Sequence, residues 1–281
     1  MFNVSILQYK IEFLKKKKNL DFVVNAIKNL KDTTLVLPEL AFTGYSFKNK
    51  NELEYVYESP IENQGIVFKT LKNLSLKNNL NIVYGFVEKE NTSYYNSACM
   101  ITKYGNIEVY RKTHLFYKEK LFFDNGNTGF KVVEVDNIKY GIAICFDWFF
   151  PESFRKLSKM NSDIILHPSN LVMPYCQEAS KTRALENKIF IATSNTYGEQ
   201  KNNDVSYNFT GMSQLTSPNG EIINRFSKDS FELKTFSIDE KLSRNKYLND
   251  YNNIFSDLKE NFYWFFHSII TSDINFRNKY I

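Results

Sequence analysis

Three residues from remote stretches of the chain carry reactive side chains where apolar packing would be expected. Cys145 lies in NIKYGIAICFDWFFPESFR, where bulky residues alternate with small ones up to the thiol. This pattern predicts a buried strand with the cysteine at its end. Glu39 follows the strand-like stretch 34–38, and Lys112 follows the stretch 107–111. A carboxylate or an ammonium group at the end of a buried strand is costly unless it has a partner or a function.

The residues after the cysteine favour the beginning of a helix. Pro151 suits the first turn of a helix and Glu152 suits its positive end, so a helix is expected over 151–160. A thiol near such donors ionises more readily, and a nearby Lys112 would favour ionisation of both Glu39 and the thiol. Two simpler explanations stay open. Cys145 is equally well explained as a small buried side chain, and Lys112 as a structural ion-pair partner of Glu39.

Five motifs in order resemble the nitrilase superfamily of carbon–nitrogen hydrolases. They are PEL with FTGY, YRKTHLF, EKLFFDNGNTGF, GIAICFDWFFPESFR and RALENKIFIATSN. The resemblance covers roughly residues 3 to 250 and is nearest to the branch of aliphatic amidases, N-carbamoyl hydrolases and archaeal nitrilase-like enzymes. It implies a catalytic triad of Glu39, Lys112 and Cys145, with Glu119 as a supporting glutamate.

The resemblance implies an enzyme that hydrolyses the carbon–nitrogen bond of a small linear amide. In this hypothesis the cysteine forms a thioester, and ammonia or an amine and a carboxylic acid are released. Tyr45, Phe146, His167 and Asn170 are candidates for substrate binding. His167 precedes a proline at a strand end, and a structural histidine explains it at least as well. Neither a metal nor a cofactor is expected, because the three scattered histidines do not have metal-ligand spacing.

Departures from the family pattern leave the substrate open. Strict nitrilases usually carry glutamate two positions after the cysteine, whereas Asp147 stands there, which leans toward amide or carbamoyl substrates. The segment 171–178 lacks the histidine-rich loop of N-carbamoylputrescine hydrolases. The alternatives are a nitrilase of small aliphatic nitriles, an N-carbamoyl hydrolase, transfer of the acyl group to an amine, and a non-catalytic binding or scaffold protein on the same fold. A Cys/His hydrolase fits less well, since lysine and glutamate accompany this cysteine.

Composition is that of a globular protein with ample material for a core. The chain has 281 residues, of which 43% are hydrophobic and 24% charged, and no Pro/Gly/Ser-rich linker divides it. A net charge of +5, with one basic run at 15–18, is a thin signal for nucleic-acid binding, and none is expected. Three well-separated cysteines predict neither a disulfide framework nor a metal site. Without a signal-peptide pattern or a long apolar run, we expect a cytoplasmic protein that does not contact membranes.

Alternation of helical and strand periodicity predicts an α/β (α+β) fold. Helices are expected over 19–29, 61–79, 151–160 and 175–187. Strands are expected over 3–9, 34–38, 81–87, 96–102, 107–111, 131–135, 138–145, 163–167, 189–194, 209–216, 221–226 and 233–238. The family resemblance implies a four-layer α-β-β-α sandwich, with two sheets face to face and helices outside.

The C-terminal segment contains the aromatic block NFYWFFHSII. Residues 1–255 are predicted to form the hydrolase domain, and 256–281 an aromatic tail. A block of this kind forms a sizeable apolar patch if exposed, so burial on the body or against a second subunit is expected. Since C-terminal segments often pack at a dimer interface in the family, a homodimer or a higher homo-oligomer is predicted.

Overall fold

The structure is a computed structural model that describes residues 1–259. It divides into two compact units, Met1–Asn245 and Lys246–Ile281. The described part of the second unit contains an isolated antiparallel bridge between Tyr247 and Asn253. The boundary predicted at residue 255 falls inside this unit. Most of the predicted interface tail, residues 260–281, lies outside the described residues.

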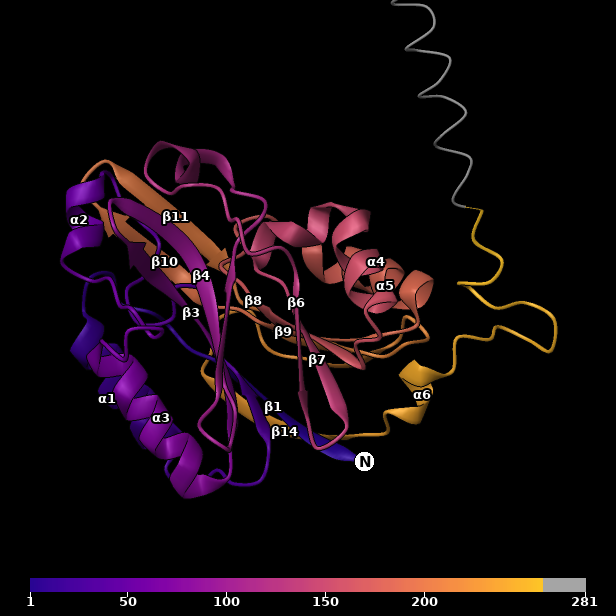
Figure 1. Ribbon diagram of the computed structural model, residues 1–281. Helices are drawn as coiled ribbons and strands as arrows, with labels where there is room; N and C mark the ends of the chain where they lie inside the picture. The colour runs from indigo at the N-terminus through magenta and orange to yellow at the C-terminus, as the bar shows by residue number, and fades with distance from the viewer. Residues whose placement is uncertain (260–281) are drawn as a thin grey trace, which may run out of the picture. The chain divides into compact units, whose positions relative to one another are not determined.

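Two six-stranded sheets form the centre of the first unit (Figure 1). Their strand orders are β14-β1-β2-β3-β4-β5 and β13-β12-β9-β8-β7-β6. In each sheet the three strands β1, β2, β3 or β7, β8, β9 are parallel, and the outer strands are antiparallel. The strands are β1 Phe2–Gln8, β2 Thr34–Val36, β3 Asn81–Glu90, β4 Ser93–Ile101, β5 Ile107–Arg111, β6 Lys131–Val135, β7 Ile138–Ile142, β8 Ile164–Pro168, β9 Phe190–Ser194, β12 Gln214–Thr216, β13 Ile222–Arg225 and β14 Glu232–Ile238.

Helices cover the outer faces of the two sheets. Figure 1 shows α1 and α3 along the first sheet, and α4 and α5 along the second. The helices are α1 Lys16–Ala26, α2 Lys50–Glu54, α3 Ile66–Asn78, α4 Pro151–Lys159, α5 Cys176–Asn187 and α6 Lys241–Arg244, with the 3₁₀ turns η1 Tyr117–Leu121 and η2 Cys145–Phe149. The order of layers is helix, sheet, sheet, helix, which confirms the predicted α-β-β-α sandwich.

The period-two alternation of the strands produces two apolar layers. In β1, Val4 and Ile6 belong to the core between the sheets, together with Ile142 and Ile165 from the second sheet. Leu7, the next residue, belongs to the layer beneath α1 and α3. A sheet buried on both faces needs apolar residues on both, which explains the nearly continuous hydrophobic character of these strands. The ends of these rigid strands are where the candidate catalytic residues stand.

Two local predictions were wrong. The single strand predicted over 209–216 is broken at Gly211 and Met212, whose φ angles of 59° and 53° are left-handed. The residues before the break form β11 (Val205–Thr210), which pairs with the unpredicted β10 (Tyr197–Asn202) in a separate ribbon. Asn19, where the helix over 19–29 was predicted to begin, lies inside α1. Its side-chain amide donates to two backbone carbonyls, at 2.7 and 2.9 Å.

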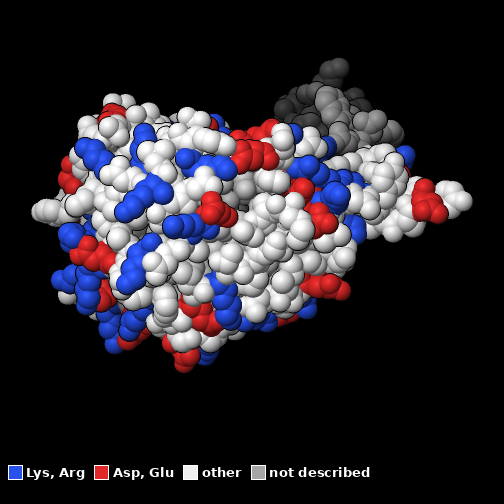
Figure 2. Space-filling view, turned by 90° about the horizontal axis from the view of Figure 1, so that it is seen from below, with Lys and Arg blue, Asp and Glu red and all other residues white. Residues whose placement is uncertain are grey.

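Surface charges of both signs lie close together. Figure 2 shows lysines and arginines interspersed with aspartates and glutamates on one face. The basic run 15–18 lies at the beginning of helix α1, and three of its members are paired: Lys16 lies 3.1 Å from Glu58. Lys17 lies 2.5 Å from Asp21, and Lys18 lies 2.5 Å from Glu12. Such pairing at exposed positions reduces the local excess of positive charge. Among residues 1–259, no helix has the length and apolar character needed to span a membrane.

Candidate active site

Glu39 stands in the turn that follows β2, and its side chain is fully buried. Gly85, on the neighbouring strand β3, leaves the space that this turn occupies. A Cβ on Gly85 would lie 2.6 Å from the Cα of Glu39 and 2.4 Å from the backbone nitrogen of Leu40. The turn can therefore lie this close to the strand only because residue 85 has no side chain. On its other side, the Glu39 carbonyl accepts a hydrogen bond of 2.8 Å from the side-chain amide of Asn170.

Lys112 follows β5 and is held by backbone and side-chain contacts. Its backbone N–H donates to the Asn96 carbonyl at 2.9 Å. Its Nζ lies 2.7 Å from Oε1 of Glu39, and 2.8 and 2.9 Å from the two carboxylate oxygens of Glu119. The side-chain amide of Asn96 donates to both glutamates, at 2.7 Å to Glu39 and 3.2 Å to Glu119. The structure therefore brings Glu39, Asn96, Lys112 and Glu119 into one hydrogen-bonded group.

Cys145 begins the 3₁₀ turn η2, beyond the end of β7 at Ile142. Its φ of 38° lies in the left-handed region, which residues other than glycine rarely adopt and which is concentrated at functional sites. The turn is closed by Asp147, whose N–H donates to the Ile144 carbonyl at 3.0 Å. The strand predicted over 138–145 was therefore too long: β7 ends at Ile142, and Cys145 begins a separate turn. The helix predicted from Pro151 is present as α4.

Burial and the charges of the neighbouring groups together shift the pKa values of Cys145, Glu39 and Lys112. Burial first, and then the charge of Glu39, raise the pKa of Cys145 well above its usual value, against the opposing charge of Lys112. Burial also raises the pKa of Glu39, although Lys112 opposes this shift. Burial alone would lower the pKa of Lys112, but the charges of Glu119 and Glu39 outweigh it and raise that pKa. The expectation of a readily ionised thiol was wrong: the resting thiol is neutral and the lysine is charged.

A small cavity of about 20 Å³ adjoins the thiol. Apart from Cys145, it is lined by apolar side chains and one amide: Phe116, Phe146, Trp148, Asn170, Leu171, Val172 and Met173. Two of the four predicted substrate-binding residues, Phe146 and Asn170, are in this lining. Phe146 packs against Phe116, with ring centroids 5.0 Å apart. Oδ1 of Asn170 is buried and has no hydrogen-bond partner among the described residues, so this acceptor is available to a ligand.

The other two predicted substrate-binding residues lie outside this lining. Tyr45 is buried beside Tyr207 and Phe209, with ring centroids 5.3 and 6.1 Å away. Burial and then the charge of Glu119 raise the pKa of Tyr45 well above its usual value. The charges of Glu119 and Glu39 both act on Tyr45, so its side chain lies near the hydrogen-bonded group around Lys112.

His167 lies behind the nucleophile. Its Nε2 is 2.9 Å from the backbone carbonyl oxygen of Cys145, and its Nδ1 is 3.1 Å from Oγ1 of Thr193. Because a carbonyl oxygen only accepts, Nε2 carries the hydrogen and Nδ1 accepts from the threonine hydroxyl. Burial lowers the pKa of His167 to about 4, so the ring is neutral near pH 7. In this position the ring supports the turn that carries the thiol.

Sequence reasoning missed Asn96, which binds both glutamates. The available signal was an asparagine in the middle of the strand sequence SYYNSACMI, now β4, where it is fully buried. A buried amide in a strand needs partners, but the sequence does not say which segment supplies them. Sequence reasoning also did not single out the segment 171–173, which contributes apolar surface to the cavity.

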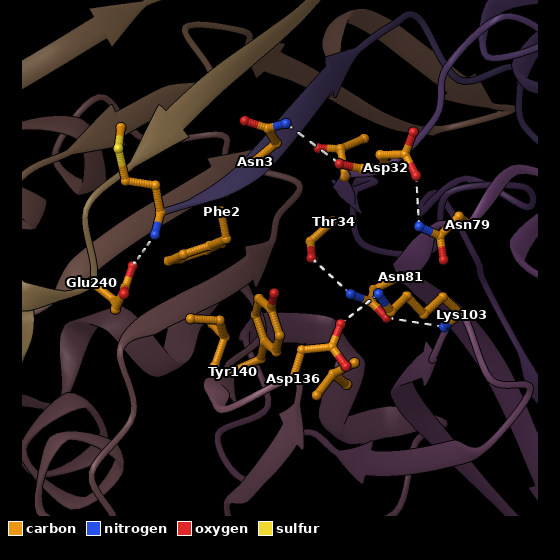
Figure 3. Close-up of a pocket in the computed structure, with 14 residues that line it drawn as sticks. Phe2, Asn3, Asp32, Thr34, Asn79, Asn81, Lys103, Asp136, Tyr140 and Glu240 are labelled. Carbon is orange, nitrogen blue, oxygen red and sulfur yellow. Dashed lines mark hydrogen bonds and ion pairs between the residues drawn. The ribbon is translucent and has the colours of Figure 1, made fainter.

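A larger cavity, about 360 Å³, lies at the opposite edge of the sheets (Figure 3). Its lining includes the beginnings of β1, β3 and β7, whereas Glu39 and Cys145 follow the ends of β2 and β7. The polar groups drawn there bind one another. Asn79 donates to Asp32 at 2.6 Å, Asn81 to Thr34 at 3.1 Å, and Lys103 forms an ion pair with Asp136. With its polar groups already satisfied in this way, the cavity is a weaker candidate for chemistry than the small one beside Cys145.

The buried Glu39–Lys112 pair and the Cys145 thiol are consistent with a hydrolase of the class that uses a glutamate, a lysine and a cysteine. Within residues 1–259, no cluster of three or more His, Cys, Asp or Glu side chains is arranged to hold a metal ion. The carbon-nitrogen hydrolase family model matches residues 3–246. The chain therefore belongs to the carbon–nitrogen hydrolase family, the nitrilase superfamily.

Individual relatives carry different names within this family. The chain is 39% identical to a nitrilase of Pyrococcus abyssi over 94% of this chain and all of the relative. It is 31% identical to a 2-oxoglutaramate amidase of Bacillus subtilis, covering 78% of this chain and 84% of the relative. The structure of a CN-hydrolase superfamily protein from Xanthomonas campestris superposes with a TM-score of 0.77 at 18% identity, covering 87% of this chain and 93% of the other. At that identity the similarity concerns the fold alone.

Proposed function

We propose that the chain hydrolyses the carbon–nitrogen bond of small, uncharged linear amides, with Cys145 as nucleophile and Glu39 as base. The observation that carries this proposal is the state of the Glu39 carboxylate. Its Oε1 binds Lys112 and Asn96, whereas its Oε2 is buried and has no hydrogen-bond partner among the described residues. A buried oxygen without a partner is costly, and such exceptions are found at catalytic positions. Because the charge of Glu39 acts directly on the Cys145 thiol, this oxygen is the candidate proton acceptor.

The raised pKa values of both groups suit a proton transfer that accompanies attack. A neutral thiol beside a base of raised pKa loses its proton as sulfur attacks the carbonyl carbon, which leaves the oxygen negatively charged. Lys112 and the backbone N–H of Phe146 would stabilise that oxygen. Glu39 then returns the proton to the departing nitrogen, and ammonia or an amine leaves a thioester. Water that gives its proton to Glu39 attacks the thioester, the carbon–sulfur bond breaks, and Glu39 passes the proton to the departing sulfur as the carboxylic acid is released.

The three carboxylate contacts of Lys112 explain how the lysine can serve in this step. The ammonium group has three hydrogens, and its contacts with Glu39 and Glu119 use the available directions. Since Glu119 contacts Lys112 through both oxygens, one of these contacts can be shared when a substrate oxygen arrives. We assign Glu119 the role of holding the lysine charged and in place.

The cavity lining supports an uncharged substrate. No Lys, Arg, Asp or Glu side chain of residues 1–259 is among the residues that line it. An acyl group with a carboxylate would lose hydration there without meeting a cation, which is unfavourable. The volume of about 20 Å³ accommodates about one water molecule, so the acyl group is small, or the aromatic side chains shift to admit it.

A nitrile substrate is the second candidate, because the relative at 39% identity is named a nitrilase. The same thiol can attack a nitrile carbon, and two molecules of water then give ammonia and the acid. Asp147, whose identity leans toward amides, is fully buried and lies outside the cavity lining. Any influence of this residue on substrate choice is therefore indirect. An N-carbamoyl hydrolase, with a ureido group in place of the amide, is a further candidate.

The proposal is tested by measuring ammonia release from a panel of matched substrates. Propionamide and propionitrile compare the two functional groups, a monoamide of a dicarboxylic acid adds a charge, and an N-carbamoyl amino acid tests the ureido alternative. We expect propionamide to give the highest kcat/KM and the charged amide to give at least tenfold less. Preference for the nitrile would favour the second candidate. Absence of turnover across a broad panel would favour a non-catalytic scaffold.

A further inference from the structure

The carboxylate of Asp147 receives hydrogen bonds from two separate chain segments. Its Oδ2 accepts from the backbone N–H of Ile144 at 2.9 Å and from the hydroxyl of Tyr110 at 2.7 Å. Its Oδ1 accepts from the backbone N–H of His114 at 3.2 Å and lies 2.8 Å from Nδ1 of the same histidine. The side chain is fully buried, so water does not substitute for these donors. A buried carboxylate satisfied in this way is a fixed point in the structure.

The two segments are those that carry the nucleophile and the catalytic lysine. Ile144 immediately precedes Cys145, while Tyr110 and His114 stand on either side of Lys112 in the sequence. The carboxylate of Asp147 therefore joins the turn η2 to the segment that follows β5. Both segments are otherwise anchored in different sheets, since β5 belongs to the first and β7 to the second. The separation of the thiol from the ammonium group depends on how these two sheets are held together at this point.

We propose that Asp147 is a positioning residue that sets the geometry of Cys145 relative to Lys112. Resting on the proposed function, this inference assigns Asp147 a role that neither the triad nor Glu119 performs. The left-handed conformation of Cys145, with φ of 38°, is one that a cysteine adopts only when its surroundings impose it. The hydrogen bond from Ile144 N–H to the carboxylate, together with that from Asp147 N–H to the Ile144 carbonyl at 3.0 Å, imposes it here. The same turn directs the Phe146 N–H that the mechanism needs for the substrate oxygen.

Asp147→Asn tests the proposal with almost no change in shape. Each carboxylate oxygen accepts from a backbone N–H, Ile144 on one side and His114 on the other. Whichever oxygen becomes the amide NH₂ group, a donor then faces a backbone donor, and one of the two segments moves away. A misplacement of about 1 Å in a catalytic site costs about 100-fold in rate. We therefore expect kcat to fall about 100-fold while KM changes less than threefold, because Asp147 does not line the substrate cavity.

Asp163→Asn is the matched control. Asp163 is also buried, and it also binds a backbone N–H, that of Lys139 at 2.9 Å, together with the Arg244 guanidinium at 2.8 Å. It precedes β8, at the edge of the sheet opposite the thiol. Both variants should lose thermal stability, but Asp163→Asn should keep the kcat of the wild type. A role of Asp147 in stability alone would make the two variants behave alike.

A second readout does not depend on the substrate. The rate at which iodoacetamide alkylates Cys145, followed by peptide mass mapping at constant pH, should fall in Asp147→Asn and stay unchanged in Asp163→Asn. If the wild type turned over no substrate, the proposed function would fail, while the alkylation rates would still decide the role of Asp147. Wild-type kcat and wild-type alkylation in folded Asp147→Asn would overturn the inference.

Tyr110→Phe provides the test if Asp147→Asn does not fold. It removes one of the four contacts of Asp147, the hydrogen bond of 2.7 Å, together with the hydrogen bond of 3.1 Å that the Thr113 N–H donates to the same hydroxyl, and it leaves the carboxylate and both of its backbone donors in place. Loss of one such bond corresponds to about a fivefold change in an equilibrium or a rate. We expect a fall in kcat of about that size with KM retained. Unchanged kcat and alkylation in this folded variant would equally overturn the inference.

Discussion

Replacing Glu39 by glutamine removes the proposed base but keeps its shape. The amide oxygen of the new side chain can take the place of Oε1, which accepts from Lys112 and Asn96 at 2.7 Å each. Its NH₂ group then occupies the position of Oε2, the oxygen without a partner among the described residues. The geometry of the site is therefore retained, while its ability to take a proton is lost. Loss of a general base lowers turnover by about 10²–10⁴-fold, or about 3–5 kcal/mol of transition-state stabilisation.

The same substitution should make the Cys145 thiol easier to ionise, although it stops turnover. After burial, the charge of Glu39 is the largest cause that raises the pKa of Cys145, and the charge of Lys112 is the larger of the two causes that lower it, the other being a backbone hydrogen bond with Asn170. Two carboxylates and one ammonium group leave one negative charge beside the thiol, and Glu39→Gln removes it. The pKa of Cys145 therefore falls in the variant. We expect faster alkylation of Cys145 by iodoacetamide at pH 8 in a variant that has lost turnover.

Both rates are measured on the same preparations, as ammonia release and as alkylation resolved by peptide mass mapping. Glu58→Gln is the matched control, because Glu58 is also buried and accepts from two backbone N–H groups at 2.9 Å in a remote part of the fold. It should lose stability and leave the reactivity of Cys145 unchanged. Slower alkylation in Glu39→Gln, or turnover within threefold of the wild type, would refute the reasoning about the charge and role of Glu39.

Two further predictions concern the supports of the site. Gly85→Ala should destabilise the fold by about 3 kcal/mol or more and abolish turnover, because its Cβ meets backbone atoms at 2.4 and 2.6 Å. The control is Gly129→Ala, where φ is 64° and a Cβ would meet no atom within 4 Å. It should lower the free energy of unfolding in urea by only about 1 kcal/mol. Equal losses in the two variants would contradict this account. The pKa of His167 falls from 6.5 to about 4 on folding, so the unfolded chain binds the extra proton below pH 6.5. The contribution of the neutral His167 ring to the free energy of unfolding is present above pH 6.5. It is lost as the pH falls toward 4, by about 3 kcal/mol in total. The test is the free energy of unfolding of His167→Asn, measured in urea over this pH range. If it still fell by that amount, another group would be responsible.

The three candidate catalytic residues could be singled out from sequence because each breaks a local pattern, and the family resemblance implied that they form a triad. Glu39, Lys112 and Cys145 stand just beyond buried strands, where a charged or reactive side chain needs a reason. The direction of the pKa shift at Cys145 could not be found in this way, since it depends on how completely the folded chain excludes water. Asn96 escaped notice for a related reason: its partners come from segments remote in the sequence, and no spacing within β4 indicates them.

The strands of the sandwich were predictable because alternation is a local property. Strand β6 has its predicted bounds, and β1 and β14 differ from prediction by a residue at one or both ends. The alternation is interrupted at the break, since Ser213 and Gln214 are consecutive polar residues after Gly211 and Met212, but this interruption does not predict that the backbone changes direction there. The pairing of β10 with β11 depends on that change of direction. The order of strands within each sheet was not predicted, since the hydrophobic pattern does not specify which strands are neighbours.

Ammonia release by Cys145→Ala is the measurement that tests the central claim most directly. The claim is that the thiol of Cys145, beside the Glu39 and Lys112 pair, attacks the substrate carbon and forms a covalent intermediate. With a preparation that has the circular dichroism spectrum and melting temperature of the wild type, we predict no release above the uncatalysed rate. Turnover by this variant at a rate comparable with that of the wild type would contradict the account.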